Sequence, residues 1–305
     1  MRILVTGAGG FIGGHCLRQL QEAGGAELHA VGRTARTEEG VRWHAADLRD
    51  PSQAGALVAK VKPTHLLHAA WIATPGVYAS SPENLDWLTA SVALARSFGE
   101  TGGLRFVGIG SSAEYEAGEA PCAEDATPIR PASIYGKCKA ACWLAVQAAA
   151  QRHGFSAAWG RLFLPYGPGD TPGRLIPSLR ARLAARETVE TTEGTQVRDF
   201  IFAPDAAALL VRLLHGRQEG AFNLGTGRGV AVREVIGTVA DHYGARSLVR
   251  FGSVPLAPGE PRRLVADMAK VEREIEWSAP TGLAEGLSRT LAENGSRDTV
   301  KQTHR

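Results

Sequence analysis

The sequence predicts an α/β fold in which helices cover both faces of a parallel sheet. In the first half of the chain, short apolar runs alternate with longer stretches of helical character. Strands that alternate with helices indicate βαβ units, whose right-handed crossovers produce a parallel sheet. A glycine-rich turn follows the first apolar run directly, and the regular alternation stops near Leu164. These observations together favour a doubly wound sheet followed by a less regular second unit.

The elements follow from local signals along the chain. The expected strands span residues 2–7, 28–33, 64–71, 104–112 and 156–163, and a further strand ends near residue 47. The expected helices span residues 11–24, 52–61, 82–100 and 135–152. The first helix is expected to end at Gly24-Gly25, and Gly154 follows the last one. Glycine commonly ends a helix because it adopts positive φ without strain.

Composition narrows the class of protein. The 305 residues can form one large or two medium domains, and 44% hydrophobic with 21% charged residues is typical of a soluble globular chain. A formal net charge of +3 gives no support to a nucleic-acid or membrane-surface role. The four cysteines lack CxxC spacing, so we expect reduced structural thiols and no metal site. We expect neither a secretory signal peptide nor a membrane-spanning segment, and therefore a cytoplasmic location.

The segment "TGAGGFIG" lies between the first strand and the first helix. Gly7 would allow a tight turn, Gly10 would let backbone amides approach a pyrophosphate, and Gly13 would let helix and strand pack closely. The alternative is a simple strand–helix turn. The position of the glycine-rich segment in a βαβ unit favours dinucleotide binding. Phe11 and Ile12, in the same loop, are further candidate cofactor contacts. The expected fold is therefore a Rossmann-type doubly wound parallel sheet with a smaller interleaved C-terminal substrate domain.

The second expected strand indicates which dinucleotide is bound. An NAD site usually has Asp or Glu at this strand end, whereas "VGRTAR" has Arg33 and Arg36. Guanidinium groups attract a 2′-phosphate, so we expect NADP, with NAD as the alternative. The alternative interpretation is that both arginines are simply solvated loop residues. Asp47 and Leu48, after the third strand, are candidate adenine contacts.

The domain boundaries follow from the change near Leu164. We expect residues 1–163 to form the NADP-binding domain, to which residues 197–224 return as a strand and a helix. Residues 164–196 and 225–305 would then build the smaller substrate-binding domain.

Tyr135 and Lys139 are four residues apart, on one side of the expected helix. A nearby ammonium favours the phenolate, so Lys139 should lower the pKa of Tyr135 and allow it to exchange a proton with a substrate oxygen. Ser111 and Ser112 end the preceding strand at the carboxyl edge of the sheet, where ligands bind in open α/β folds. A plain helix surface and a pair of turn serines are the alternatives.

These motifs, with "HAAW", "YGKCK", "RLFLPYGPG", "QVRDFIF" and "FNLGTG", make residues 2–287 resemble extended short-chain dehydrogenases/reductases of the NAD-dependent epimerase/dehydratase type. That family comprises nucleotide-sugar epimerases, dehydratases and 4-keto reductases. The resemblance implies Ser112, Tyr135 and Lys139 as catalytic residues, with Lys139 on the nicotinamide ribose. It also implies cofactor contacts at Ala69 and Ala70, a nucleotide contact at Arg198, and a homodimer formed through the helix bearing the Tyr and Lys.

The chain departs from the family pattern at three places. Leu164 stands where an Asn often touches substrate, and Ala257 stands where an Arg often binds the diphosphate. Arg263 is the candidate replacement, with Arg262 beside it. Dehydratases often carry an Asp–Glu pair after the catalytic hydroxyl, and here only Glu114 remains as a candidate base.

The leading hypothesis is NADPH-dependent reduction of a nucleotide-linked 4-keto, deoxy sugar, with a nucleotide-diphosphate sugar as the substrate partner. The alternatives are a redox-neutral 4-epimerase or 4,6-dehydratase and, less favoured, a nonenzymatic dinucleotide-binding module. A ketone that is not a sugar is a further alternative for the substrate.

Overall fold

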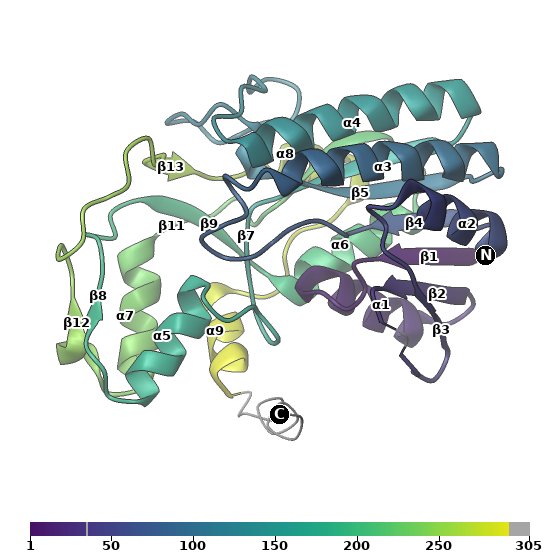
Figure 1. Cartoon of the computed structure of the whole chain (residues 1–305). Helices are drawn as coiled ribbons and strands as arrows, with labels where there is room; N and C mark the ends of the chain where they lie inside the picture. Colours follow the sequence, from purple (N-terminus) through teal and green to yellow (C-terminus); the bar gives the residue numbers. More distant parts are fainter. Residues whose placement is uncertain (35, 293–305) are drawn as a thin grey trace.

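A seven-stranded parallel sheet forms the centre of the computed structural model, which describes residues 1–34 and 36–292 (Figure 1). The strand order is β10-β6-β5-β4-β1-β2-β3. The strands are β1 (Arg2–Thr6), β2 (Glu27–Gly32), β3 (Val41–Ala45), β4 (His65–His68), β5 (Arg105–Ser111), β6 (Ser156–Leu162) and β10 (Gly220–Leu224). The order reverses at β1, where β2 lies on one side and β4 on the other. The predicted Rossmann-type sheet is confirmed.

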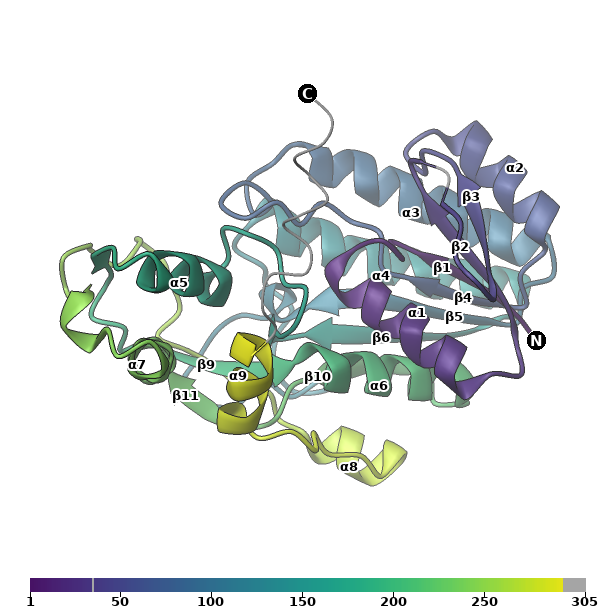
Figure 2. The same ribbon diagram turned by 90° about the horizontal axis from the view of Figure 1, so that it is seen from below.

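Helices cover both faces of this sheet (Figures 1 and 2). α1 (Phe11–Ala23) and α6 (Ala203–His215) lie together on one face. α2 (Pro51–Val61), α3 (Glu83–Glu100) and α4 (Ile134–His153) lie on the other. Each face buries its own apolar cluster against the strands. Both faces are hydrophobic, as expected for a parallel sheet buried on both sides.

Local sequence explains where α4 begins and ends. The Ser133 side chain accepts a hydrogen bond from the Gly136 amide at 3.1 Å, which satisfies one of the free amides of the first turn. Gly154, with φ of 78°, ends the helix in the left-handed conformation. Tyr135 is therefore fixed in the first turn of α4, next to the carboxyl end of β5.

The remaining elements form a second unit, on the far side of the molecule from the N-terminus in Figure 1. A four-stranded sheet contains β7 (Leu164–Tyr166), β9 (Val197–Phe202), β11 (Gly229–Ala231) and β13 (Arg263–Leu264). β8 (Val189–Glu190) pairs with β12 (Val249–Arg250). The helices of this unit are α5 (Leu175–Ala184), α7 (Val232–His242) and α9 (Leu283–Ala292). The short helix α8 (Ala269–Ile275) packs instead beside β10, with Val271 and Ile275 in the apolar cluster of the first sheet. α5, α7 and α9 pack with β9 around a separate apolar cluster.

One expectation about the chain path is wrong. The strand at residues 197–202 was expected to return to the first sheet, but β9 pairs with β7, β11 and β13 instead. β7 follows β6 after a break at Phe163 and aligns in parallel with β9, which holds β9 in the second unit. Of the elements in residues 197–224, α6 and β10 rejoin the first sheet. Residues 293–305 of the expected second domain lie outside the described residues.

Candidate active site

The glycine loop at the β1–α1 junction is closely packed. Gly7 has φ of 64°, and a Cβ on it would lie 2.6 Å from the Ala69 carbonyl carbon. A Cβ on Gly13 would lie 2.2 Å from the Gly7 carbonyl oxygen. The Gly10 amide donates to that same oxygen at 2.8 Å. Ala69 and Ala70 therefore lie directly against the loop, as a cofactor contact at these residues requires.

The loop suits the dinucleotide that its sequence implies. α1 begins at Phe11, and no side chain caps the amides of its first turn, which also contains no acidic residue. Uncapped amides at a helix N-terminus form a ready site for an anion such as a pyrophosphate. Phe11 is half-buried and Ile12 is buried at the start of this helix. A bound dinucleotide would be held here by backbone amides.

Arg36 lies over the same loop. Its guanidinium is 5.0 Å from the centre of the Trp43 ring, and a Cβ on Gly9 would be 2.9 Å from both of its terminal nitrogens. Arg33 is exposed in the same turn, directly after β2. β2 ends at Gly32 without an acidic residue. Two positive charges thus follow β2 where an NAD site would usually have a carboxylate.

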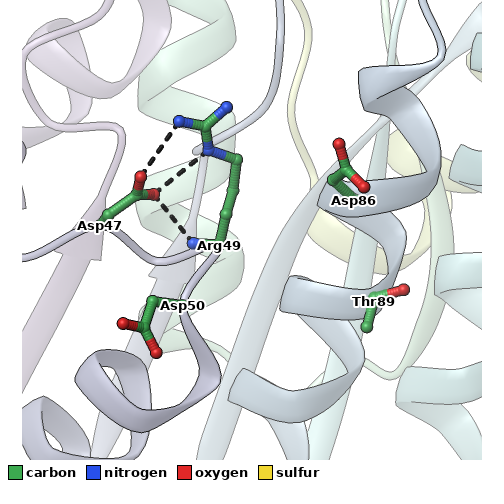
Figure 3. Close-up of a pocket in the computed structure, with 5 residues that line it drawn as sticks. All are labelled: Asp47, Arg49, Asp50, Asp86 and Thr89. Atoms are coloured by element: carbon green, nitrogen blue, oxygen red, sulfur yellow. Dashed lines mark hydrogen bonds and ion pairs between the residues drawn. The ribbon is translucent and has the colours of Figure 1, made fainter.

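Asp47 follows β3, and Arg49 already engages its carboxylate. Oδ1 accepts from the Arg49 amide and Nε at 3.0 and 3.2 Å, and Oδ2 accepts from Nη2 at 3.0 Å. These bonds are the main reason that the pKa of Asp47 is lowered. Figure 3 shows the pair lining a cavity of about 390 Å³, opposite Asp86 and Thr89 of α3. Leu48 is buried beside it. Adenine would therefore compete with Arg49 for Asp47, and this contact stays a prediction.

Ser111 lies at the carboxyl end of β5, beside Tyr135. It ends the strand in an extended conformation, and the interaction of its side chain with the phenol acts to lower the pKa of Tyr135. Ser112, the predicted partner, begins the short helix η1 (Ser112–Glu114). Successive residues of a strand point to opposite faces, so a shift of one residue changes which side chain faces the site. Ser111 is therefore a second candidate beside Ser112, and the catalytic role of Ser112 stays a prediction.

Lys139 lies one turn after Tyr135 and is almost fully buried. Its Nζ donates to the Ile109 carbonyl at 2.7 Å, and the Trp71 ring centre lies 4.0 Å from it. Nζ is 6.0 Å from the centre of the Tyr135 ring. Burial lowers the pKa of Lys139 to about 8. The Trp71 ring thus covers the lysine.

The expected lowering of the Tyr135 pKa is not observed. Burial raises the pKa of Tyr135 above its usual range, and the Ser111 hydrogen bond and the Arg174 charge act in the opposite direction. The Lys139 ammonium is engaged by Ile109 and Trp71 rather than by the phenol. Tyr135 is therefore protonated at neutral pH in the free chain.

Glu114 stabilises the turn that carries Ser111. Its side chain is fully buried, and Oε1 accepts from the Ser111 amide at 2.8 Å and from Trp159 Nε1 at 2.9 Å. Oε2 accepts from Arg161 Nε at 3.0 Å in a buried ion pair. A carboxylate with these donors is held as a structural group. The arrangement gives no support to Glu114 as a base that reaches substrate.

A second cavity, of about 150 Å³, lies between the segment around Tyr78 and the segment that follows β6. Tyr78 lines it and packs edge-on against the Tyr135 ring, with centroids 4.9 Å apart. Leu164 forms part of its apolar wall, and Asp170 and Arg174 are its charged residues. Sequence reasoning missed this acid–base pair because it lies in an irregular Pro- and Gly-rich segment with no motif.

The two arginines expected to contact the nucleotide lie on paired strands. Arg198 of β9 is opposite Leu264, next to Arg263 on β13. The Arg198 guanidinium donates to the Val197 carbonyl at 2.9 Å and forms a close ion pair with Glu260. Glu260 ends the "APGE" segment in which Ala257 replaces the family's arginine. The structure thus brings Arg198 and Arg263 together, with Glu260 as the present partner of Arg198.

Two general features complete the description. Within residues 1–34 and 36–292, no helix is long and apolar enough to cross a membrane. The same residues contain no cluster of three or more His, Cys, Asp or Glu side chains arranged to hold a metal ion.

Known proteins resemble the chain over nearly its whole length. A UDP-glucose 4-epimerase of Bacillus subtilis (strain 168) is 27% identical, with 93% of this chain and 94% of the relative covered. A dTDP-4-dehydro-6-deoxy-D-allose reductase of a Streptomyces species is 30% identical, with 94% of each covered. The solved structure of MoeE5 in complex with UDP-glucose and NAD is 31% identical with a TM-score of 0.84, covering 95% of this chain and 97% of that chain.

The model of the NAD dependent epimerase/dehydratase family matches residues 3–225. This match includes the glycine loop, the end of β5, and the Tyr135–Lys139 pair of α4. The family resemblance seen in the motifs is therefore confirmed over well over half of the sequence. The chain belongs to the NAD-dependent epimerase/dehydratase family, within the extended short-chain dehydrogenases/reductases, and is an enzyme of the nucleotide-sugar epimerase, dehydratase and reductase class.

Proposed function

We propose that the protein is an NADPH-dependent reductase of a nucleotide-linked 4-keto sugar. The observation that supports this most directly is the position of Arg36 over the glycine loop, stacked on Trp43, with no acidic residue at the end of β2. A guanidinium there favours a cofactor with a 2′-phosphate. A reductase exchanges NADP at every turnover, which suits this preference. The Streptomyces relative is named as a reductase of a 4-dehydro-6-deoxy sugar.

The residues of the site suit proton donation to a keto oxygen. Bound NADPH would supply the hydride. Tyr135, whose pKa is raised by burial, is protonated at neutral pH and can donate its proton to the developing alkoxide. The Ser111 side chain, which acts to lower the pKa of Tyr135, would assist it at the same oxygen. The glycine loop would hold the pyrophosphate, Arg33 and Arg36 the 2′-phosphate, and Lys139 the nicotinamide ribose.

Cofactor preference is the first test. We expect the wild-type chain to bind NADPH at least tenfold more tightly than NADH, measured by fluorescence titration. Arg36→Gln should reduce that ratio by about tenfold, or about 1.4 kcal/mol. Arg33→Gln is the matched variant and should have a smaller effect, because Arg33 is exposed and does not contact the loop. Equal affinity of the wild type for the two cofactors would contradict the proposal.

The proton donor is tested by three substitutions. Tyr135→Phe should abolish turnover while NADPH still binds. Ser111→Ala should lower kcat by about 10²-fold, in the usual range for a group that assists proton transfer. Ser112→Ala is the matched variant and should retain more activity, because Ser111 is the serine whose side chain affects the pKa of Tyr135. If Ser112→Ala is the more damaging serine variant, the assignment of Ser111 is wrong.

A redox-neutral 4-epimerase is the second candidate, favoured by the curated relatives with that name. The two functions differ in their use of cofactor. A reductase consumes NADPH in proportion to product, whereas an epimerase converts a sugar nucleotide without net consumption. Dehydration is less favoured, because Ala113 lacks a carboxylate and that of Glu114 is fully buried.

A further inference from the structure

The Lys139 side chain places a positive charge in the interior of the first unit. The residue is 4% exposed, and burial lowers the pKa of its ammonium to about 8. Tyr135, one turn earlier on α4, is a neutral phenol because burial raises its pKa. Taking an ammonium out of water is costly unless other groups replace the lost hydration. The groups around Lys139 therefore decide at which pH it stays charged.

The ionisable groups on the elements around Lys139 do not bond its ammonium directly. Cys142, on the next turn of α4, is a neutral thiol because burial raises its pKa to about 11. His68, at the end of β4, is also neutral, since burial lowers its pKa to about 3. The Glu114 carboxylate favours the ammonium, but it is already paired with Arg161 Nε at 3.0 Å.

The Trp71 indole is a direct partner of the ammonium. Nζ lies 4.0 Å from the centre of the Trp71 ring and 5.8 Å from that of Trp159. It also donates to the Ile109 carbonyl at 2.7 Å. The electron-rich face of an indole attracts a cation, most strongly where water is excluded. Trp71 therefore acts against the effect of burial and favours the charged form of the lysine.

Other side chains hold the Trp71 ring in this position. Its Nε1 donates to Asn84 Oδ1 at 2.8 Å. Asn84 is fully buried, and its Nδ2 donates to the carbonyls of Tyr78 and Ser81 at 2.7 and 2.8 Å. The Trp87 ring stacks on Trp71, with ring centres 6.5 Å apart. The indole is thus oriented by the loop after β4 and by α3, before any ligand binds.

The ammonium keeps one donor for a ligand. An ammonium has three N–H donors, of which the Ile109 carbonyl takes one and the Trp71 ring covers another. In the part of the chain that the structure describes, no second hydrogen-bond acceptor meets Nζ. Trp71 directly follows Ala69 and Ala70, which lie against the glycine loop. A cofactor bound at that loop would therefore lie near the Trp71–Lys139 pair.

We propose that Trp71 is a positioning residue for Lys139, which keeps the ammonium charged and leaves one N–H donor for the bound cofactor. The proposal rests on the proposed function, because the contact of Lys139 with the nicotinamide ribose comes from there. Trp71 acts through the lysine. A leucine at position 71 would also cover the lysine but would not attract its charge, so loss of the indole should matter most where Lys139 begins to lose its proton.

The pH dependence of cofactor binding tests this role. Fluorescence titration gives Kd for NADPH, and in parallel for NADH, from pH 7 to 9.5 in the wild type, Trp71→Leu and Trp71→Phe. An ammonium that contributes to binding makes affinity fall as pH rises through its pKa. We expect this fall about one pH unit lower in Trp71→Leu. Its affinity should be within about twofold of the wild type at pH 7 and about fivefold weaker at pH 8.5. Trp71→Phe, which keeps an aromatic face, should lie between the two.

A double-mutant cycle isolates the contact between the two side chains. Lys139→Met has no ammonium, so the fall of affinity with pH should disappear, and adding Trp71→Leu should then change Kd by less than twofold. Trp277→Leu, at a half-buried position after α8, is the matched control and should change neither the affinity nor its pH dependence. Thermal unfolding confirms that each variant is folded.

The outcomes separate this proposal from the proposed function. A loss of affinity that is equal at pH 7 and 8.5, or that persists in Lys139→Met, would mean that Trp71 is only structural. A fall displaced to higher pH in Trp71→Leu would mean that the indole only excludes water. Each of these results overturns the role of Trp71 and leaves the reductase proposal standing.

Two further results bear on Lys139 and on the cofactor. If Lys139→Met binds NADPH as tightly as the wild type at every pH, Lys139 does not hold the cofactor, and the role of Trp71 fails with it. Equal affinity of the wild type for NADPH and NADH contradicts the reductase proposal alone. The role of Trp71 is then supported or overturned by the same titrations with NADH.

Discussion

At the scale of one residue, Asp170 shows how burial of a carboxylate can reduce the stability of the folded state. Its side chain is only 4% exposed, and burial raises its pKa to about 6 from 3.8. The folded state therefore holds a proton more tightly than the unfolded state. By linkage, this group lowers stability progressively as pH rises from about 4 to about 6, and the loss is complete above pH 6. At neutral pH, Asp170 thus carries a charge that the fold disfavours.

Asp170→Asn should accordingly stabilise the protein at neutral pH. We expect the free energy of unfolding at pH 7.5 to rise by about 1–3 kcal/mol, since each unit of pKa shift corresponds to about 1.4 kcal/mol. At pH 4 the gain should fall below half of that value. Urea unfolding at the two pH values measures both. Asp241→Asn, at a well-exposed position, is the control and should change little at either pH. A gain that is equal at pH 4 and 7.5 would mean that ionisation is not the cause.

At the scale of an element, the β1–α1 junction depends on close backbone approach. We predict that Gly13→Ala abolishes cofactor binding and destabilises the chain by about 1–3 kcal/mol, because the new Cβ would lie 2.2 Å from the Gly7 oxygen. Gly14→Ala is a matched control one residue later. Its Cβ would lie 3.4 Å from the nearest atom, and alanine favours a helix by about 1 kcal/mol over glycine. Cofactor titration and urea unfolding of both variants test the contrast, which equal effects would refute.

The same scale shows what the sequence could predict. Alternating apolar runs and the glycine loop predicted the central sheet, because both signals depend on local patterns. Which serine assists Tyr135 is a different problem, since Ser111 and Ser112 are adjacent at the end of β5 and a single residue decides which hydroxyl faces the site. The position of β9 was missed for a related reason. Its apolar run is compatible with either sheet, and only its pairing with β7 decides between them.

At the scale of the whole molecule, α3 and α4 present an unpartnered outer surface. They cover one face of the central sheet side by side (Figure 1). Leu85 and Val92 on α3 are 54% and 37% exposed, and Leu144 on α4 is 67% exposed. Leu85 and Val92 are seven residues apart and therefore lie on one side of their helix. Exposed apolar residues on neighbouring helices are typical of a surface that binds a partner.

We therefore predict a homodimer in which α3 and α4 pack on the same helices of a second copy. Leu144→Glu would bury a charge at that interface without a partner, so it should shift the protein to the monomer. Sedimentation velocity across a hundredfold concentration range measures the change. Leu256→Glu, at a 41% exposed position in the second unit, is the control and should leave the dimer intact. A monomeric wild type, or a dimer unaffected by Leu144→Glu, would place the interface elsewhere or exclude it. Because α4 also carries Tyr135 and Lys139, dissociation should lower NADPH affinity as well, and the same samples can be titrated to test that coupling.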